Sequence, residues 1–438
     1  MPLEVFSSEQ AWETAYRNKL ARYPTPNSGL DRLYPFPAPE TKSTFKFPTD
    51  AKIFSIGSCF AGSLDVALVS SGMNIISRSK EVAEKIKDRE NTSAVYNKYT
   101  LQSVLNEVRW ALDPSTPYPG EGALTEMGEG KWTDLNLGGA TGYYSGPKEE
   151  ILALREAYSA SVRKIAEADV VILTLGLVES WYDKQLGIHL NVGPSLQMVD
   201  NFPDRYEFHT YKYGEMLQTI EDIYQVIKKF GKPGVKFIVT VDPVPLIMTY
   251  RDRDVIVANA YSKSLLRAVA EEFVMLHDDV DYFPTYEFVY FGEHKQTYGS
   301  DFRHVSAAVV RRIVAKMISK YLQADQLIPL KLGEEIKLLS QDKDYPAILE
   351  KVKKTNLETL DPTTLFHVAT AHKDAGDKKA AFQLYLKVNE RAPTMRSALA
   401  SAITLAKQLS LTEEMNFLLA KHEATFPADA AFRAKFGK

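Results

Sequence analysis

The sequence predicts a three-layer α/β/α domain with a mainly parallel sheet, followed by a small all-α domain. Short runs of β-branched and other apolar residues at 52–57, 169–176 and 235–243 are typical of buried strands. Helix-like segments lie between these runs, and this alternation indicates a sheet covered by helices on both faces. From about residue 330 glycine becomes scarce and only helical patterns follow. We therefore expect an N-terminal segment at 1–50, an α/β domain at 51–325 and a helical domain at 326–438.

The composition excludes several classes of protein. The chain has 438 residues, of which 45% are hydrophobic and 25% charged, as in ordinary globular proteins. The formal net charge of −3 gives no electrostatic reason to expect nucleic acid or an anionic membrane surface as a partner. A single cysteine excludes an internal disulfide framework and favours a reducing compartment. Neither a secretory signal nor an apolar run of about 20 residues is visible, so we expect a soluble, cytoplasmic protein without a membrane span.

Residues 1–50 are predicted to form a short helix and a connection that wraps the surface of the α/β domain. Six prolines between residues 24 and 48 exclude a continuous helix or strand there. A proline fixes its own φ and lacks the N–H that either element needs.

The first strand, at 52–57, ends in a turn suited to a nucleophile. Gly57 is followed by Ser58 and Cys59, and a helix is predicted from about 60 to 72. Free backbone N–H groups at a helix N-terminus favour a thiolate or an oxyanion. Cys59 is the only cysteine of the chain, and the alternative is that it is a small buried hydrophobe. A second short strand is predicted to begin at 75–76.

Between the first two long strands, two segments carry candidate functional groups. A polar loop at 91–100 precedes a helix at 100–111, and in it Asn97 either lends an amide to the active site or belongs to a helix cap. The Gly/Pro/aromatic insertion at 112–147 is long enough to form a lid or a substrate rim; the alternative is a structural loop. A helix at about 148–167 leads into the next strand.

The strand at 169–176 brings further candidates to the edge of the sheet where open α/β folds bind ligands. Its nearly continuous apolar run predicts a central position in the sheet. Gly176 ends the strand, and Glu179 follows beside Trp181 as either a site residue or an ion-pairing and capping group. Helices at 212–229 and 255–273 and strands at 235–243 and 280–290 complete the predicted alternation.

A loop before the last helix of this domain carries a candidate base. In the spacing Asp301-x-x-His304, ahead of a helix at 305–323, the carboxylate can reach the imidazole Nδ1. The other ring nitrogen then faces the pocket as a general base. The alternative is a solvated loop histidine. The other histidines show no tight ligand spacing, so we expect neither a metal nor a cofactor.

The C-terminal domain has the spacing of a helical repeat. Gly376, Ala381, Tyr385 and Pro393 fall at offsets typical of a tetratricopeptide (TPR) helix pair, and Pro427 lies 34 residues after Pro393, which is the period of that repeat. We expect two degenerate TPR-like repeats after a leading helix at 333–353. Such stacks leave a surface for protein partners or self-association. The alternative is an appendage that only covers the α/β domain or a dimer interface.

With these motifs in place, residues 30–325 resemble the GSCFA family, named for Gly-Ser-Cys-Phe-Ala, here at 57–61. Further segments carry the resemblance in the right order, at 174–181, 240–245, 258–263, 282–287 and 301–304. The family looks like a branch of the SGNH/GDSL hydrolase superfamily, whose members are mostly esterases and acyltransferases acting on O-acyl groups. The resemblance implies a flavodoxin-like, SGNH hydrolase-like catalytic domain at 51–325.

The sequence departs from the superfamily pattern in two blocks. In the block Gly-Asp-Ser the nucleophilic serine stands third, which places Ser58 at the aspartate position and Cys59 at the serine position. No asparagine follows Gly176 where the block Gly-x-Asn-Asp has one, so the oxyanion hole must be built differently. Asp301 and His304 match the last block without alteration.

The resemblance implies an acyl-ester hydrolase or O-acyltransferase that acts on acylated carbohydrates or similar small O-acyl substrates. Cys59 would attack the acyl carbonyl, His304 would relay the proton and Asp301 would orient His304. Ser58 is the alternative nucleophile. Oxyanion and substrate-binding groups are expected at Gly57, Asn97, Gly176 and Glu179.

A second class of function is consistent with the same residues. The fold would then be a non-catalytic binding or assembly module in polysaccharide or cell-surface biosynthesis, with the helical repeats docking partners. The missing asparagine after Gly176 favours this hypothesis. The intact pair of Asp301 and His304 favours the enzyme, because an oriented base is hard to explain without chemistry.

Overall fold

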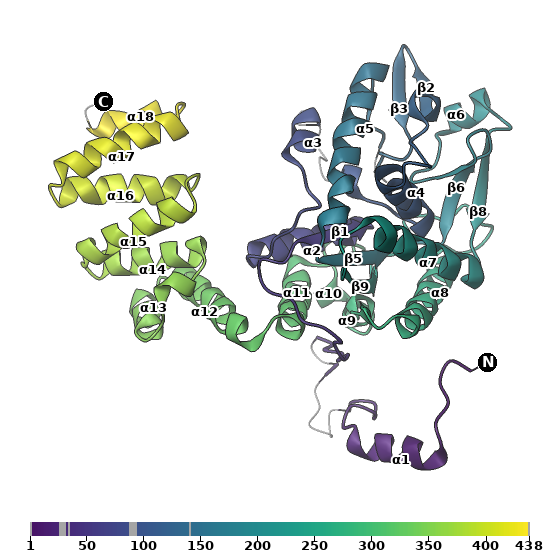
Figure 1. The fold of residues 1–438 in the computed structure, drawn as a ribbon, viewed down its shortest axis with the longest axis horizontal. Helices are drawn as coiled ribbons and strands as arrows, with labels where there is room; N and C mark the ends of the chain where they lie inside the picture. The colour runs from purple at the N-terminus through teal and green to yellow at the C-terminus, as the bar shows by residue number, and fades with distance from the viewer. Residues whose placement is uncertain (1, 26–31, 34–35, 87–93, 140–141, 437–438) are drawn as a thin grey trace. The chain divides into compact units, whose positions relative to one another are not determined.

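The computed structural model describes residues 2–25, 32–33, 36–86, 94–139 and 142–436 (Figure 1). The chain divides into two compact units, Met1–Leu322 and Gln323–Lys438. The first is mixed α/β with a parallel sheet, and the second is helical. Parts of the predicted Pro-rich connection, at 26–31 and 34–35, and of the predicted polar loop, at 91–93, lie outside the described residues. No helix in the described part of the chain is long and apolar enough to cross a membrane.

A four-stranded parallel sheet forms the centre of the first unit. Its order is β1-β5-β9-β10, and its strands are β1 (Ile53–Gly57), β5 (Val170–Leu175), β9 (Lys236–Val241) and β10 (Val280–Tyr282). Gly57 pairs with Thr174 and Thr174 with Thr240, so the carboxyl ends of three strands lie side by side. On the other edge of β1, where the sequence predicts a second strand, Ile75 forms a single parallel bridge with Ile53. The prediction of a parallel sheet is confirmed.

Helices cover both faces of this sheet, since its strands are buried on both sides. Alternate strand residues such as Phe54, Leu173 and Val239 belong to a core shared with the helices of one face. These helices are α4 (Leu101–Leu112), α7 (Tyr213–Phe230) and α8 (Val255–Leu276). The other helices that contact the sheet include α2 (Cys59–Ser70), which packs on β1 and on α11 (Ala307–Tyr321).

Two small antiparallel sheets interrupt this alternation. One lies in the insertion at 112–147 and contains β2 (Leu124–Gly128), β3 (Lys131–Asp134) and β4 (Ser145–Gly146). The other follows β5, has the order β7-β6-β8 and contains β6 (Glu179–Asp183), β7 (Ile188–Leu190) and β8 (Tyr206–Thr210). Neither sheet is predicted from the sequence, because the strands are short and mix polar with apolar residues. The remaining helices of the unit are α1 (Ser8–Arg17), α3 (Lys80–Lys85), α5 (Lys148–Arg163), α6 (Leu196–Asn201) and α10 (His294–Thr297).

The structure corrects two predicted elements. Of the strand predicted at 280–290 only Val280–Tyr282 is a strand, and α9 (Thr285–Tyr290) follows it. Pro284 precedes this helix and has no N–H to continue the ladder. The single leading helix predicted at 333–353 is two helices, α12 (Ala324–Gln341) and α13 (Tyr345–Val352), because the chain turns at Lys343 with a φ of 58°.

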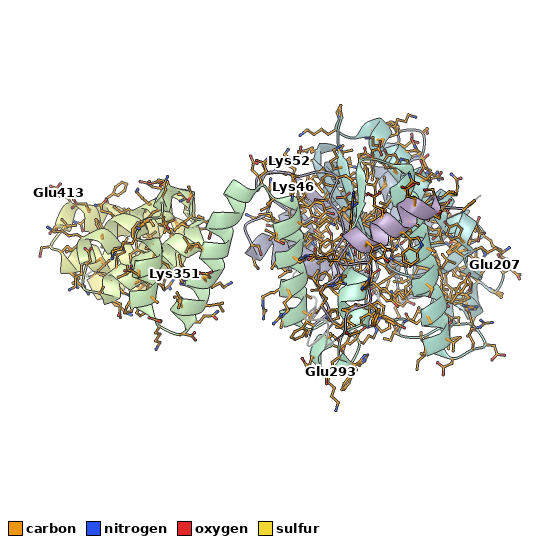
Figure 2. The ribbon with its side chains drawn as sticks, turned by 90° about the horizontal axis from the view of Figure 1, so that it is seen from below. Lys46, Lys52, Glu207, Glu293, Lys351 and Glu413 are labelled. Carbon is orange, nitrogen blue, oxygen red and sulfur yellow. The ribbon has the colours of Figure 1, made fainter. Side chains whose placement is uncertain are left out.

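The second unit has its own hydrophobic core. After α13 it contains α14 (Pro362–Asp374), α15 (Lys378–Arg391), α16 (Arg396–Gln408), α17 (Thr412–Thr425) and α18 (Ala430–Arg433). Successive helices from α14 to α17 pack on one another around side chains such as Leu365, Tyr385 and Leu399. Charged side chains such as Lys351 and Glu413 lie on the surface of this unit, as Glu207 and Glu293 do on the first (Figure 2). The predicted helical C-terminal region is confirmed.

A buried ion network connects the insertion to the helices of the first unit. Arg155 of α5 donates from Nη1 to Glu107 of α4 at 2.6 Å and from Nε to Asp134 of β3 at 2.8 Å. The three side chains are at most 3% exposed. The Tyr118 hydroxyl donates to Asp134 at 2.8 Å, and Lys98 Nζ lies 3.5 Å from Glu107. Each charge in this interior therefore has a partner of opposite sign, as a buried charge requires.

Candidate active site

The first strand ends in a turn that requires glycine. Gly57 has a φ of 142°, and a Cβ at this position would lie 2.2 Å from the carbonyl oxygen of Thr174 on β5. The backbone conformation and the contact each exclude a side chain. The close approach of the two strands places Ser58 and Cys59 at the carboxyl edge of the sheet, beside the end of β5.

Ser58 and Cys59 begin α2 in different environments. Ser58 is the N-cap residue, but its side chain makes no capping bond, and its Oγ is buried. It lies near enough to the carboxylate of Asp242 to lower the pKa of that group. Cys59 is the first residue of the helix and is half-buried, whereas Ser58 is fully buried. The hydroxyl therefore interacts with the Asp242 carboxylate and does not cap the helix.

Burial dominates the ionisation of the Cys59 thiol. It raises the pKa to about 12, and the Asp242 carboxylate acts in the same direction, whereas Arg303 and Lys263 oppose it. Desolvation of the thiol outweighs the helix N-terminus and both cations, which favour the thiolate. At neutral pH this group is a thiol, and a nucleophilic role requires a base.

A buried lysine from α8 reaches the end of β5. Lys263 is 1% exposed, and its Nζ donates to the carbonyl oxygen of Gly176 at 2.8 Å. Burial lowers the pKa of Lys263, while Asp242 and Cys59 raise it. Asp242 follows β9 and accepts a hydrogen bond from the backbone N–H of Val244 at 2.7 Å; burial raises the pKa of this carboxyl. An acid, a thiol and an ammonium thus interact at the same edge of the sheet.

Gly176 has close neighbours on two sides. A Cβ there would lie 2.4 Å from the carbonyl oxygen of Tyr99 and 3.2 Å from the Cβ of Ser58. The same Tyr99 oxygen accepts a hydrogen bond from the N–H of Leu177 at 2.8 Å. The structure therefore brings together two predicted site residues, Gly176 and Ser58.

Replacing Gly176 with alanine should destabilise the first unit by about 1–3 kcal/mol, because the added Cβ must displace the Tyr99 carbonyl. Gly214 in α7 is the matched control, since nothing lies within 4 Å of a Cβ there and alanine is favoured over glycine inside a helix by about 0.5–1 kcal/mol. Urea unfolding of both variants measures the difference. Equal stability of the two would contradict the close packing at Gly176.

Asp301 and His304 form a hydrogen-bonded pair. His304 Nδ1 lies 2.5 Å from Asp301 Oδ2, and the backbone N–H of His304 donates to Oδ1 at 3.0 Å. The bond from the imidazole holds the pKa of Asp301 well below its usual range. Arg303 Nη1 lies 3.4 Å from His304 Nε2. Because a guanidinium only donates, we assign the proton to Nδ1 and the free electron pair to Nε2.

Arg303 interacts both with the Asp301–His304 pair and with the Cys59 thiol. Its Nε donates to the carbonyl oxygen of Pro245 at 3.2 Å, in the loop after β9, and its charge lowers the pKa of Cys59. The side chains of His304 and Asp301 are 55% and 48% exposed. In the part of the chain that the structure describes, no hydrogen bond joins Cys59 to His304. Asp301 therefore orients the imidazole, which is not bonded to the thiol.

Asn97 lies beside the nucleophile turn. Its backbone forms a parallel bridge with Gly57, and the N–H of the next residue, Lys98, donates to the Gly57 carbonyl at 2.7 Å. Among the described residues, the side-chain amide makes one long hydrogen bond, from Nδ2 to the Tyr99 hydroxyl at 3.4 Å. The amide thus has donor capacity to spare near the helix N-terminus.

Glu179 belongs to a second polar cluster, at the start of β6. It is 8% exposed, and its Oε2 accepts a hydrogen bond from the Thr249 hydroxyl at 2.8 Å. Its Oε1 forms an ion pair with Arg251 Nη1 at 3.8 Å and has no closer polar partner in the part of the chain that the structure describes. Burial raises the pKa of Glu179. Trp181 lies two residues along the strand, with its ring centroid 5.0 Å from that of the exposed Tyr250.

Sequence reasoning assigned no role to three charged residues of this region, Asp242, Lys263 and Arg303. Each leaves a signal in the sequence. Asp242 directly follows a buried strand, Lys263 lies on the apolar face of a helix, and Arg303 precedes the oriented histidine. Charges are rarely placed in apolar surroundings without a partner or a function.

Comparison with protein families matches the α/β unit. The family model described as GSCFA family matches residues 52–317, a range that contains both Cys59 and His304. No curated protein matches the chain at a significant level. Among the described residues, no group of three or more His, Cys, Asp or Glu side chains has the geometry to hold a metal ion.

Proposed function

Because the chain belongs to the GSCFA family, we propose that its α/β unit is an SGNH-like hydrolase or acyltransferase that forms a covalent acyl-enzyme on Cys59. One observation carries the proposal: Arg303 interacts both with the thiol and with His304, whose unprotonated Nε2 accepts a hydrogen bond from the guanidinium and whose Nδ1 is bonded to Asp301. An imidazole oriented by a carboxylate has the geometry of a general base.

The strand order supports the SGNH-like and flavodoxin-like assignment. With the Ile75 bridge counted as a rudimentary second strand, the order in the sheet is 2-1-3-4-5, as in flavodoxin-like sheets. Such sheets bind ligands between their first and third strands, at the carboxyl ends. Here that position lies between Ser58, after β1, and Gly176, after β5.

In the proposed reaction, the Arg303 guanidinium moves off His304 Nε2, which takes the proton of Cys59 while Sγ attacks the acyl carbonyl carbon. The carbonyl π bond opens to an oxyanion, which accepts hydrogen bonds from the backbone N–H of Cys59 and the amide of Asn97. The C–O bond then breaks, and His304 returns the proton to the leaving alcohol, so that a thioester remains. Water or a second alcohol attacks the thioester by the same route. Lys263 and Arg303 supply positive charge as the thiolate and the oxyanion develop.

Exposure favours Cys59 over Ser58 as the nucleophile. Ser58 Oγ is fully buried, whereas Cys59 is half-buried at the start of the helix. A thiol also transfers its proton to a neutral imidazole more readily than a hydroxyl does. In this proposal the buried Ser58 hydroxyl interacts with the Asp242 carboxylate beside the thiol and does not react.

The cluster around Glu179 supports an acylated carbohydrate or similar O-acyl substrate. A buried carboxylate oxygen without a hydrogen bond and a nearby guanidinium are suited to binding hydroxyl groups. The rings of Trp181 and Tyr250 next to them offer an apolar face with polar edges. Pockets for small molecules commonly combine apolar walls with a few such polar groups.

Intact-mass spectrometry after incubation with p-nitrophenyl acetate tests the proposal. We expect wild type and Ser58→Ala to gain one acetyl group and Cys59→Ala to gain none. Ser70→Ala, an exposed change at the far end of α2, is the matched control and should behave as wild type. An adduct that survives Cys59→Ala but not Ser58→Ala would move the nucleophile by one residue. Absence of an adduct from every form would favour the second candidate function.

That second candidate is a non-catalytic binding or assembly module in polysaccharide or cell-surface biosynthesis, and the high pKa of the Cys59 thiol favours it. The helical unit would then dock partners. Helices α16 and α17 begin 34 residues after α14 and α15, and the turn residues Gly376 and Ser410, both with positive φ, are also 34 apart. This period supports TPR-like repeats. Under either function we propose a cytoplasmic location.

A further inference from the structure

The N-terminal helix α1 carries apolar side chains that the described chain leaves uncovered. None of its residues is buried, and Trp12 and Tyr16 are 64% and 72% exposed. Their rings stack on each other with 5.6 Å between centroids. Other exposed apolar residues flank the helix: Leu3, Val5, Phe6, Leu20 and Tyr23. A concentration of exposed aromatic and aliphatic side chains of this kind marks an interaction site.

This segment is nevertheless built to be helical. Ser7 and Gln10 form a capping box, in which each side-chain oxygen accepts the backbone N–H of the other residue, at 3.2 and 3.0 Å. Glu13 and Arg17 form an ion pair at 2.7 Å one turn apart. A helix of 10 residues is marginal on its own. The capping box and the ion pair therefore favour the helix, but a binding partner must supply the rest of its stability.

The acidic and basic residues of the segment lie in separate halves, and this separation favours a second copy of the segment as the partner. Three glutamates lie in its first half and three basic residues in its second, at Glu4, Glu9, Glu13, Arg17, Lys19 and Arg22. Two copies placed side by side in antiparallel orientation bring the acidic half of each against the basic half of the other. In the register centred on Thr14, Trp12 of one copy faces Tyr16 of the second copy and Glu9 faces Lys19, because the members of each pair are equally far from Thr14.

We propose that residues 3–23 are a self-association surface, on which two copies of the chain pair their α1 helices antiparallel about a two-fold axis. An interface of this symmetry must be complementary to itself, and the charge order meets that condition. A membrane surface fits less well, because helices that lie on membranes carry mainly Lys and Arg on their polar face. Here the acidic and basic residues are equal in number.

Sedimentation velocity of the full chain over a range of concentrations tests the proposal. We expect the mass to rise from that of the 49.2 kDa monomer towards twice that value. The double change Trp12→Ser and Tyr16→Ser should weaken self-association at least tenfold. The charge reversals E9K/E13K and R17E/K19E should each weaken self-association at least tenfold when the variant is studied alone. An equimolar mixture of the two variants should restore the dimer. Reversal of two exposed glutamates on α3, E81K/E84K, controls for a general charge effect.

Several outcomes would overturn the proposal. These are a chain that stays monomeric at every concentration, a dimer that the Trp12 and Tyr16 changes leave intact, and reversed variants that fail to recover on mixing. Co-sedimentation of wild type, but not of the Trp12 and Tyr16 variant, with anionic phospholipid vesicles would assign the surface to a membrane instead. Circular dichroism of each variant shows whether the two units remain folded.

Discussion

Replacing His304 with alanine should slow acylation of Cys59 by about 10²- to 10⁴-fold, the usual contribution of a general base. The pKa of the thiol is about 12, so hardly any thiolate is present at neutral pH. Attack on an ester then depends on removal of the proton as the bond to carbon forms. Release of p-nitrophenolate under single-turnover conditions measures the rate. His209→Ala, a change in β8, is the control for loss of an imidazole elsewhere in the unit.

The pH dependence separates the base from a merely structural role of His304. In wild type the base removes the thiol proton during the attack, so the rate should depend less steeply on pH than in the variant. Without the base only the thiolate reacts, so the rate of the variant should rise about tenfold per pH unit towards the thiol pKa of about 12. An equal rate and an identical pH profile in His304→Ala and wild type would rule out this histidine as the base.

Replacing Arg155 with methionine should lower the free energy of unfolding by about 3–5 kcal/mol. Methionine fills much of the volume but leaves the carboxylates of Glu107 and Asp134 in the interior without the guanidinium between them. Removing one member of a buried ion network lowers the free energy of unfolding by more than the whole network raises it, because the remaining charges are left buried without a partner. Urea unfolding followed by far-UV circular dichroism measures the change.

Arg163 provides the matched control for that experiment. It lies in the same helix and donates to Glu156 at 2.6 Å, but both side chains are largely exposed. Arg163→Met should therefore change stability by at most about 1 kcal/mol. Further replacement of Glu107 by glutamine in the Arg155→Met background should restore part of the loss. Similar effects at positions 155 and 163 would show that the network contributes no more than a surface ion pair.

The parallel sheet was predictable because its strands are continuous apolar runs whose burial leaves a clear pattern in the sequence. Val170–Leu175 is buried at every position, and the predicted strand extends only one residue further at each end. The antiparallel strands gave no such signal. Trp181 and Tyr182 are partly exposed, and Lys131 begins β3 as an exposed residue, so neither alternation nor a long apolar run was visible.

For the candidate site, contacts within one loop were predictable and contacts between distant segments were not. Asp301 and His304 are three residues apart, so their spacing alone indicated the hydrogen bond. Lys263 reaches Gly176 across 87 positions of the chain, a contact that no local pattern reports. The ionisation of Cys59 depends on how deeply the folded chain buries the thiol. The helix terminus could be recognised in the sequence, but the desolvation that outweighs it could not.

The turn at Gly57 also determines how sites of this kind can diverge. Every other genetically encoded amino acid carries a Cβ, which would meet the Thr174 carbonyl oxygen at 2.2 Å. Only glycine is therefore tolerated at position 57. At position 59, in contrast, serine can replace cysteine without a change in the backbone. When distant relatives are aligned, Gly57 and the strand before it therefore identify the equivalent positions more reliably than residue 59 does.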